Sequence, residues 1–129
     1  MRYSVCKRFD FPAAHSNGHH DGHCRRKHGH TWILEVCACG PLIESEERAD
    51  YGMVVDFYRL KQAYASAIEP YVEHQDLDET LSFLPERTAE MIAAWALKQF
   101  HDQCPEVDKV RLWEGATSFV EVEWGVESR

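Results

Sequence analysis

The stretch Cys24-Arg-Arg-Lys-His-Gly-His-Thr-Trp-Ile-Leu-Glu-Val-Cys-Ala38 combines a candidate ligand set with the pattern of a strand. From His28 on, every second residue is a histidine or an apolar residue, which predicts a β-strand with one buried face. Side chains two positions apart on a strand point to the same side, so His28 and His30 can bind one ion. Cys24 lies just upstream, where a loop can bring it close. The residues of the buried face are His28, His30, Trp32, Leu34, Val36 and Ala38.

An earlier alternation ends in a third histidine. Its apolar face occupies odd positions, with Lys7 as an interruption and Pro12 limiting strand pairing near the end. His15 closes this face, and a hairpin of the two strands would bring it beside His28 and His30. Taken alone, His15 is more typical of a hydrogen-bonded core histidine. The odd positions carry Tyr3, Val5, Phe9, Phe11, Ala13 and His15.

Three imidazoles at one site leave a fourth position open for water or substrate, which is typical of catalytic rather than structural zinc. The sequence therefore predicts Zn2+ bound by His15, His28 and His30. Three more histidines lie in the polar loop 16–23, where nothing fixes them, and they are weaker candidates. These are His19, His20 and His23.

The rest of the chain predicts two helices and two further strands. Asp56 is a good N-cap for a helix that runs to Tyr71, and Pro85 and Thr88 open a second helix. Residues 73–78 form a polar loop between them, and two strands follow at 110–114 and 120–124. We therefore expect an α+β protein with the order β-β-α-α-β-β, in which two helices cover a four-stranded antiparallel sheet. The whole chain, 1–129, is expected to form a single domain.

Two acidic residues stand out beside the histidines. Glu114 shares a face with Val110 and Leu112, so its carboxylate points toward the core side at the end of a strand and needs a partner or a ligand. The alternative is that Glu114 lies beyond the packed region in solvent. Glu73 next to His74 invites an acid–base interpretation, although neighbours in sequence often point apart.

Composition limits the classes of partner. The 129 residues carry a net charge of −8, which argues against non-specific binding of nucleic acid. We find no apolar run long enough for a transmembrane helix and no signal-peptide layout, so we expect no membrane contact and a cytoplasmic location. The five cysteines are expected to remain thiols, with Cys37 and Cys39 packed in the core.

Taken together, these motifs resemble the 6-pyruvoyltetrahydropterin synthase and 6-carboxytetrahydropterin synthase family, which has the tunnelling fold (T-fold). They occur in the family's order over nearly the whole chain, and the Cys-x-x-x-His-Gly-His element is the most specific of them. The matching pieces are Phe11-Pro-Ala-Ala-His15, Cys24-x-x-x-His28-Gly-His30, Asp56-Phe57, Glu73-His74-x-x-Leu77, Thr88-Ala-Glu90 and Trp113-Glu114.

The resemblance implies a role for each candidate residue. The three histidines would bind zinc, and Cys24 would be the catalytic base, assisted by Glu73 and His74. Glu114 would anchor the pterin ring of the substrate, 7,8-dihydroneopterin triphosphate. It also implies a homohexamer of two stacked trimers with active sites at subunit interfaces.

The chain departs from the family pattern in three places. Glu73 stands where the family usually has Asp, Asp78 stands where it usually has Asn, and the Pro-Thr pair of the second helix is split into Pro85 and Thr88. The longer side chain of Glu73 affects the geometry with which Glu73 and His74 would assist Cys24 in proton transfer.

Two products are known for the family, and the sequence favours one of them. The short Cys-x-x-x-His spacing and the compact chain resemble the branch that forms 6-carboxytetrahydropterin and acetaldehyde on the route to queuosine. The alternative product is 6-pyruvoyltetrahydropterin. A different class is a non-catalytic zinc-binding protein in which Cys24 is a fourth ligand, and a nucleic-acid zinc module is a remote third option.

Overall fold

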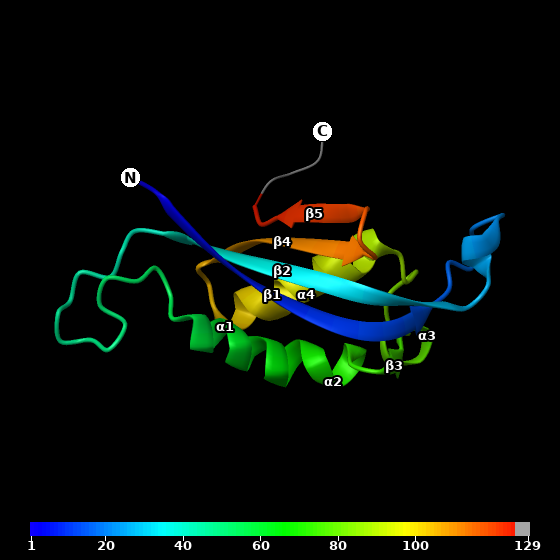
Figure 1. Ribbon diagram of the computed structural model, residues 1–129, viewed down its shortest axis with the longest axis horizontal. Coiled ribbons are helices and arrows are strands. Elements are labelled where there is room, and N and C mark those ends of the chain that lie inside the picture. The colour runs from blue at the N-terminus through cyan, green and yellow to red at the C-terminus, as the bar shows by residue number, and fades with distance from the viewer. Residues whose placement is uncertain (126–129) are drawn as a thin grey trace.

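A long β-hairpin forms the centre of the sheet in the computed structural model, which describes residues 1–125. The two strands pair antiparallel over their whole length, from Tyr3 opposite Gly40 to His15 opposite His28. The sheet has five strands in the order β3-β1-β2-β4-β5 (Figure 1). Their bounds are β1 Tyr3–His15, β2 His28–Gly40, β3 Gln75–Asp76, β4 Val107–Glu114 and β5 Phe119–Glu123.

The predicted α+β class is confirmed, with one strand more than expected. The four expected strands, β1, β2, β4 and β5, are antiparallel neighbours. β3 lies parallel to β1 at Ala13 and Ala14, within the segment that we expected to be a polar loop. A strand of two residues has no periodicity from which a sequence pattern could predict it.

Helices cover one face of the sheet, and the other face carries none among residues 1–125 (Figure 1). Both predicted helix starts are confirmed: the Asp56 side chain accepts a hydrogen bond from Tyr58 N, and Thr88 Oγ1 accepts one from Met91 N at 3.2 Å. The helices are α1 Phe57–Ala63, α2 Glu69–Val72, α3 Leu77–Thr80 and α4 Ala89–Gln103.

The first predicted helix is continuous but changes its winding. A π-helical turn, Tyr64–Ile68, joins α1 to α2. Pro70, the second residue of α2, has no N–H to donate one turn back, so the regular α-helical ladder is interrupted at this point. The short helix α3 was not predicted. The Asp76 side chain caps it by accepting from Asp78 N at 3.1 Å.

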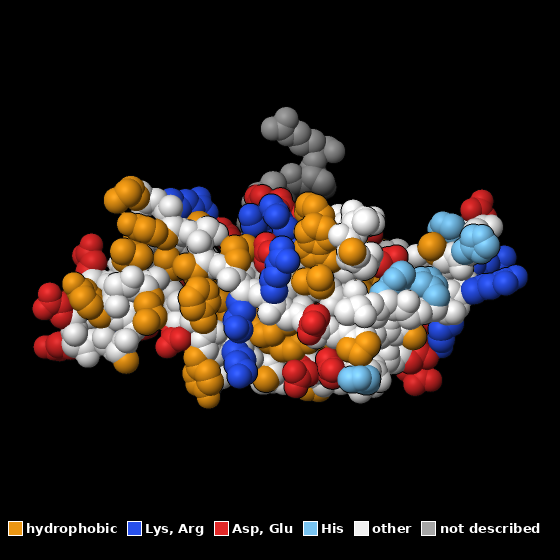
Figure 2. Space-filling view, in the orientation of Figure 1, with side chains coloured by type: hydrophobic (Ala, Val, Ile, Leu, Met, Phe, Trp, Pro, Cys, Tyr) orange, Lys and Arg blue, Asp and Glu red, His pale blue; other side chains and the backbone are white. Residues whose placement is uncertain are grey.

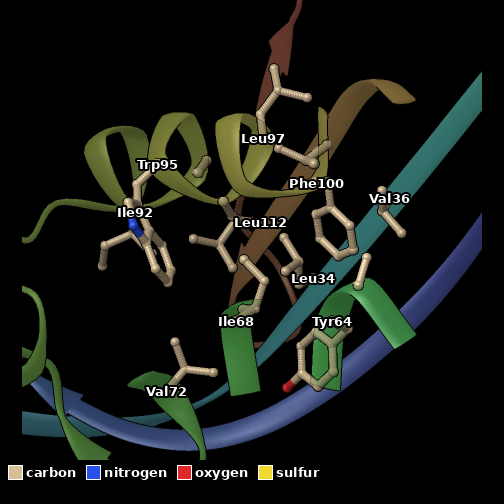
Figure 3. Packing of buried hydrophobic residues seen from close by; sticks show 14 of the residues in the cluster. Leu34, Val36, Tyr64, Ile68, Val72, Ile92, Trp95, Leu97, Phe100 and Leu112 are labelled. Carbon is tan, nitrogen blue, oxygen red and sulfur yellow. The ribbon is translucent and has the colours of Figure 1, made fainter. Parts of the chain in front are cut away.

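The core lies between the helices and the even-numbered face of β2 (Figure 3). Trp32, which is fully buried, donates from Nε1 to the carbonyl of Ala13 at 3.1 Å and so ties the two hairpin strands together. Phe9 on β1 stacks on Tyr64, with ring centroids 4.0 Å apart. No helix among residues 1–125 is long and apolar enough to cross a membrane.

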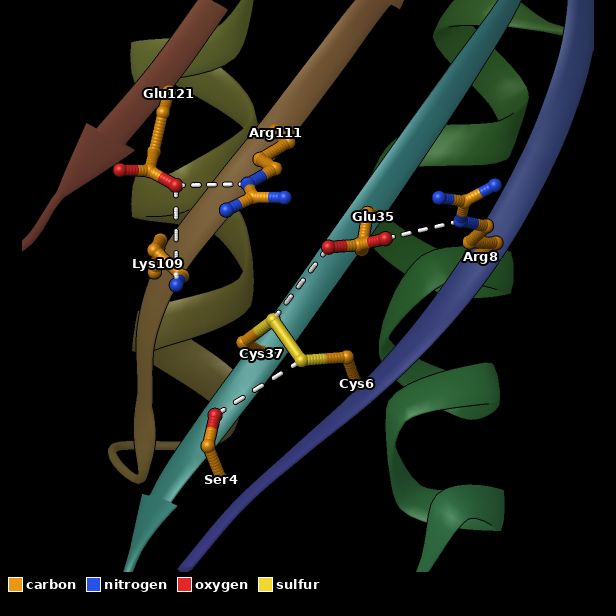
Figure 4. The surroundings of a disulfide bond; sticks show 8 residues. All are labelled: Ser4, Cys6, Arg8, Glu35, Cys37, Lys109, Arg111 and Glu121. Atoms are coloured by element: carbon orange, nitrogen blue, oxygen red, sulfur yellow. Dashed lines mark hydrogen bonds and ion pairs between the residues drawn. A yellow bond between two sulfur atoms is a disulfide. The ribbon is translucent and has the colours of Figure 1, made fainter.

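The cysteines correct one prediction. Cys6 lies directly opposite Cys37 in the hairpin, and the two form a disulfide on the sheet face away from the helices (Figure 4). Cys37 is buried as expected, but it is not a free thiol, and the free Cys39 is only half-buried. The cysteine count does not reveal this pair, because the pairing depends on the register of two strands 31 residues apart in sequence.

Candidate metal centre

Three histidines meet where β1 ends and β2 begins. The hairpin register places His15 opposite His28, and His30 lies opposite Ala13. The ring centroids are 4.6 Å apart for His15 and His28, 5.2 Å for His15 and His30, and 4.8 Å for His28 and His30. Figure 2 shows histidine side chains gathered at this end of the molecule. The sequence prediction that a hairpin brings the three imidazoles together is confirmed.

Glu114 completes the cluster from the neighbouring strand. It ends β4, opposite Trp32 of β2, and its carboxylate faces the histidines. Glu114 Oε1 lies 3.2 Å from His30 Nε2, and Oε2 lies 3.9 Å from His15 Nε2. One ligand atom from each of the four residues lies within 4.8 Å of every other, so this group can hold a metal ion.

The histidine nitrogens fit a cation. His15 is fully buried, yet its Nε2 has no hydrogen-bond partner among residues 1–125, and neither does the buried Nε2 of His30. A buried polar atom without a partner costs about 1–3 kcal/mol. A metal ion bound to these nitrogens would remove that cost, and the donor set of imidazole and carboxylate suits zinc.

Backbone carbonyls set the orientation of two of the rings. His15 Nδ1 donates to the carbonyl of Arg87 at 2.7 Å, and His28 Nδ1 donates to the carbonyl of Arg26 at 2.6 Å. This arrangement leaves Nε2 of each ring as the electron-pair donor, as in protein metal sites. Burial lowers the pKa of His30, with the nearby His15 and His28 adding to the effect against the opposing Glu114. The neutral, metal-binding form of His30 is therefore favoured.

The other loop histidines do not join the cluster. His19 Nδ1 lies 2.6 Å from Oε2 of Glu86, whose side chain is almost buried. His20 Nδ1 accepts a hydrogen bond from Gly22 N at 2.8 Å. The structure thus separates His15, His28 and His30 from the weaker candidates.

Cys24 lies in a 3-10 turn, His23–Arg25, of the loop that joins the hairpin strands. Its side chain is half-buried and free, and its carbonyl accepts from Asn17 N at 2.7 Å, which closes the loop. Cys24 does not belong to the group of ligand atoms within 4.8 Å of one another among the described residues. The arrangement with Cys24 as a fourth ligand, which the non-catalytic alternative requires, is therefore not formed among residues 1–125.

Glu73 and His74 form a pair at another place. His74 Nδ1 lies 3.0 Å from Glu73 Oε1, with the His74 side chain exposed and Glu73 half-buried. His74 N donates to the carbonyl of Pro12 on β1 at 2.9 Å, and its φ of 56° is unusual for a residue other than glycine. Over residues 1–125, no hydrogen bond or ion pair connects this pair to the three histidines.

Two contributors to the site were not predicted from the sequence. The Arg87 carbonyl that orients His15 is a backbone group, which every residue carries, so no side-chain pattern could identify it. Asp78 accepts hydrogen bonds from Ser16, the residue after His15. The only feature of the sequence that drew attention to Asp78 was that the family usually has Asn at this position.

A mixed sheet with two covering helices and an open three-histidine site on its central hairpin defines an α+β protein of the tunnelling-fold class. The crystallised Caenorhabditis elegans 6-pyruvoyl tetrahydropterin synthase has a similar fold, with a TM-score of 0.82 at 20% identity. The match covers 95% of this chain and 96% of the worm protein.

The 6-pyruvoyl tetrahydropterin synthase family model matches residues 4–124. This chain is also similar to two relatives named 6-carboxy-5,6,7,8-tetrahydropterin synthase. The Synechocystis protein is 33% identical over 115 residues, covering 88% of each chain. The Haemophilus influenzae protein is 33% identical and covers 92% of this chain and 97% of its own length. The chain belongs to the 6-pyruvoyl tetrahydropterin synthase family and is a lyase of that family.

Proposed function

We propose that this chain is a zinc-dependent lyase that converts 7,8-dihydroneopterin triphosphate to 6-carboxytetrahydropterin, with release of acetaldehyde and triphosphate, on the route to queuosine. The observation that carries the proposal is the histidine cluster, in which two buried Nε2 atoms make no hydrogen bond among residues 1–125. The two bacterial relatives are named 6-carboxy-5,6,7,8-tetrahydropterin synthase, which supports the 6-carboxy product.

Zinc held by His15, His28 and His30 would supply Lewis-acid chemistry, which acidifies the hydroxyl groups of a bound substrate side chain. Cys24 is the proposed base and has to act as a thiolate, the form that accepts a proton. Glu73 would hold one tautomer of His74, which would move protons between the side-chain oxygens of the substrate.

Glu114 and the basic loop are the proposed substrate contacts. A carboxylate can accept two parallel N–H bonds from the amidine-like edge of a pterin, and Glu114 is half-buried at the site. The triphosphate needs cations. Lys27 is already paired with Asp76 and lies 3.7 Å from Asp78, whereas Arg25 and Arg26 are exposed beside Cys24. Arg25 and Arg26 are therefore the better candidates.

We also propose that complete active sites form between copies of the chain, in a hexamer of two stacked trimers. The Glu73–His74 pair has no link to the histidines within residues 1–125. β3 covers β1 only at Ala13 and Ala14, so most of the β1 edge is open to pair with another strand. The sheet face without helices is also available to a second copy.

Product analysis tests the assignment. The zinc-loaded protein is incubated with 7,8-dihydroneopterin triphosphate, and the products are separated by mass spectrometry. We expect acetaldehyde and 6-carboxytetrahydropterin in equal amounts. A pyruvoyl product without acetaldehyde would assign the chain to the other branch of the family. Bound zinc with no turnover and no pterin binding would support a non-catalytic zinc protein.

A further inference from the structure

One carboxylate, Asp78, lies next to the candidate metal centre without belonging to it. Asp78 is the second residue of α3, at the end of the molecule where the hairpin loop lies (Figure 1). Its Oδ1 accepts a hydrogen bond from Ser16 N at 3.1 Å, and its Oδ2 accepts one from Ser16 Oγ at 2.6 Å. Because Ser16 directly follows His15, these two bonds fix the backbone at the point where β1 leaves the metal site.

Two cations approach the same carboxylate. Arg87 Nε donates to Asp78 Oδ1 at 3.4 Å, and Lys27 Nζ lies 3.7 Å from Oδ2. Lys27 immediately precedes His28, and it also pairs with Asp76. Arg87 is the residue whose carbonyl accepts the Nδ1 hydrogen of His15. Asp78 therefore contacts three residues that flank or orient the candidate ligands. Ser16 follows His15, Lys27 precedes His28, and the carbonyl of Arg87 orients His15.

The surroundings keep Asp78 ionised. Its side chain is only 16% exposed, and this burial by itself opposes ionisation. The hydrogen bonds from Ser16 and Arg87 and the charge of Lys27 outweigh burial, so the pKa of Asp78 is lowered. The negative charge that the two cations need is thus present throughout the neutral range.

Strand pairing in the hairpin does not hold the segments that Asp78 contacts. Pairing of β1 with β2 ends at His15 and His28, so the chain between Ser16 and Lys27 has no strand neighbour to hold it. Arg87 lies outside any strand or helix, just before α4. Asp78 joins the two ends of this loop, at Ser16 and Lys27, to Arg87, while Glu86 holds the middle of the loop at Gly18 and His19.

We propose that Asp78 is a positioning residue for the metal centre. It holds in place Ser16 and Lys27, the residues next to His15 and His28, and Arg87, whose carbonyl orients His15. The expected effect on zinc binding rests on the proposed function, whereas the role of Asp78 in holding these segments together does not. The usual Asn of the family could accept from Ser16 but could not pair with Lys27 and Arg87 through a charge. The aspartate of this chain makes both kinds of contact.

Hydrogen exchange on the metal-free protein tests the positioning itself. In Asp78→Ala, the amides of Ser16 and of the loop up to Lys27 should exchange at least about tenfold faster than in the unchanged protein, because the anchor at the two ends of the loop is lost and only the one at Glu86 remains. Glu106→Gln is the matched control. Glu106 is also partly buried and pairs with an arginine, Arg59. It lies away from the histidine cluster, because its backbone carbonyl accepts a hydrogen bond from Cys39 N at the opposite end of β2. Unchanged exchange of the loop in Asp78→Ala would overturn the proposal.

Zinc affinity tests the consequence for the metal. Removal of a group that orients metal ligands typically lowers affinity about 10–100-fold, and we expect a loss of this size in Asp78→Ala, a smaller one in Asp78→Asn and none in Glu106→Gln. The visible spectrum of the Co2+-loaded protein should change in the same order. If Asp78→Ala does not fold, Asp78→Asn carries both measurements.

The outcomes separate this inference from the proposed function. If the unchanged protein binds zinc and Asp78→Ala binds it equally well, the positioning role is wrong and the zinc site stands. If the unchanged protein binds no zinc, the proposed function fails, and the exchange experiment still decides whether Asp78 holds the loop.

Discussion

At the scale of single residues, Glu114 could bind either the pterin or the metal ion, and one substitution distinguishes the two roles. Glu114→Gln keeps the shape of the side chain and removes its charge. If Glu114 binds the pterin, kcat/KM should fall about 10–100-fold through loss of charged hydrogen bonds, with zinc content unchanged because three imidazoles remain. Kinetics and metal analysis of the same sample measure both. Loss of zinc would identify Glu114 as a metal ligand instead. Glu121→Gln, which breaks a pair with Arg111 on the sheet face away from the helices, is the control.

The lowered pKa of Asp78 predicts a pH dependence of stability. A carboxyl group with a lower pKa in the folded than in the unfolded state stabilises the fold above the unfolded pKa, and this contribution disappears as the pH falls through the folded pKa. Asp78→Asn should therefore lower the free energy of unfolding by about 1–3 kcal/mol at neutral pH. The difference from the unchanged protein should shrink toward zero in acid. Urea unfolding at a series of pH values measures it, and a constant difference would show that the charge is not responsible.

The sequence predicted the cluster of three histidines better than the residues that support it, and the reason is physical. His28 and His30 lie on one face of a strand because of the two-residue period of β-structure, and His15 ends an apolar face of the same kind. By contrast, the contacts of Asp78 join segments that are about 50 to 60 positions apart in the chain. No local period connects such positions, so only the folded chain reveals them.

At the scale of elements, α4 is attached to the sheet by its apolar stripe. Phe100 is fully buried in the core (Figure 3). Its ring stacks near that of Phe9 on β1, with ring centroids 6.4 Å apart. Phe100→Ala should lower the free energy of unfolding by about 3–5 kcal/mol, because it leaves a cavity between helix and sheet. Urea unfolding measures the loss. Phe83→Ala removes a ring that is 60% exposed and should have little effect. Equal effects of the two substitutions would contradict the packing described here.

Long elements were predictable from the sequence, and short ones were not. The alternation in β1, β2, β4 and β5 and the caps Asp56 and Thr88 predicted four strands and two helix starts correctly. Residues 73–78 were interpreted as a loop, whereas the structure has β3 and the start of α3 there, because a two-residue strand and a four-residue helix are too short to show a period. The Cys6–Cys37 disulfide was missed for a related reason, since it depends on strand register.

At the scale of the whole molecule, the interfacial arrangement predicts complementation between inactive chains. Cys24→Ala and His74→Ala should each lose activity about 100- to 10,000-fold, because each removes a proton-transfer group. If the two groups act from different subunits, co-assembly of the variants in equal amounts should restore about one quarter of the sites, since each site then draws its two groups independently. Mixing the two variants after separate assembly is the control. An assembled mixture without activity would show that both groups act within one chain.

The proposed assembly rests on the resemblance to the family. The open edge of β1, the sheet face without helices and the Glu73–His74 pair are properties of the folded chain that composition does not report. The relay was predicted from neighbouring residues in the sequence, and the chain alone does not join it to the metal centre among residues 1–125.

The most direct test of the central claim is the metal dependence of product formation. The protein is freed of metal with a chelator, and acetaldehyde release from 7,8-dihydroneopterin triphosphate is measured before and after zinc is returned. We predict no release without zinc, recovery at one zinc per chain, and no recovery in His15→Ala. Release from the metal-free protein, or none with a full complement of zinc bound, would contradict the assignment of His15, His28 and His30 as the centre of catalysis.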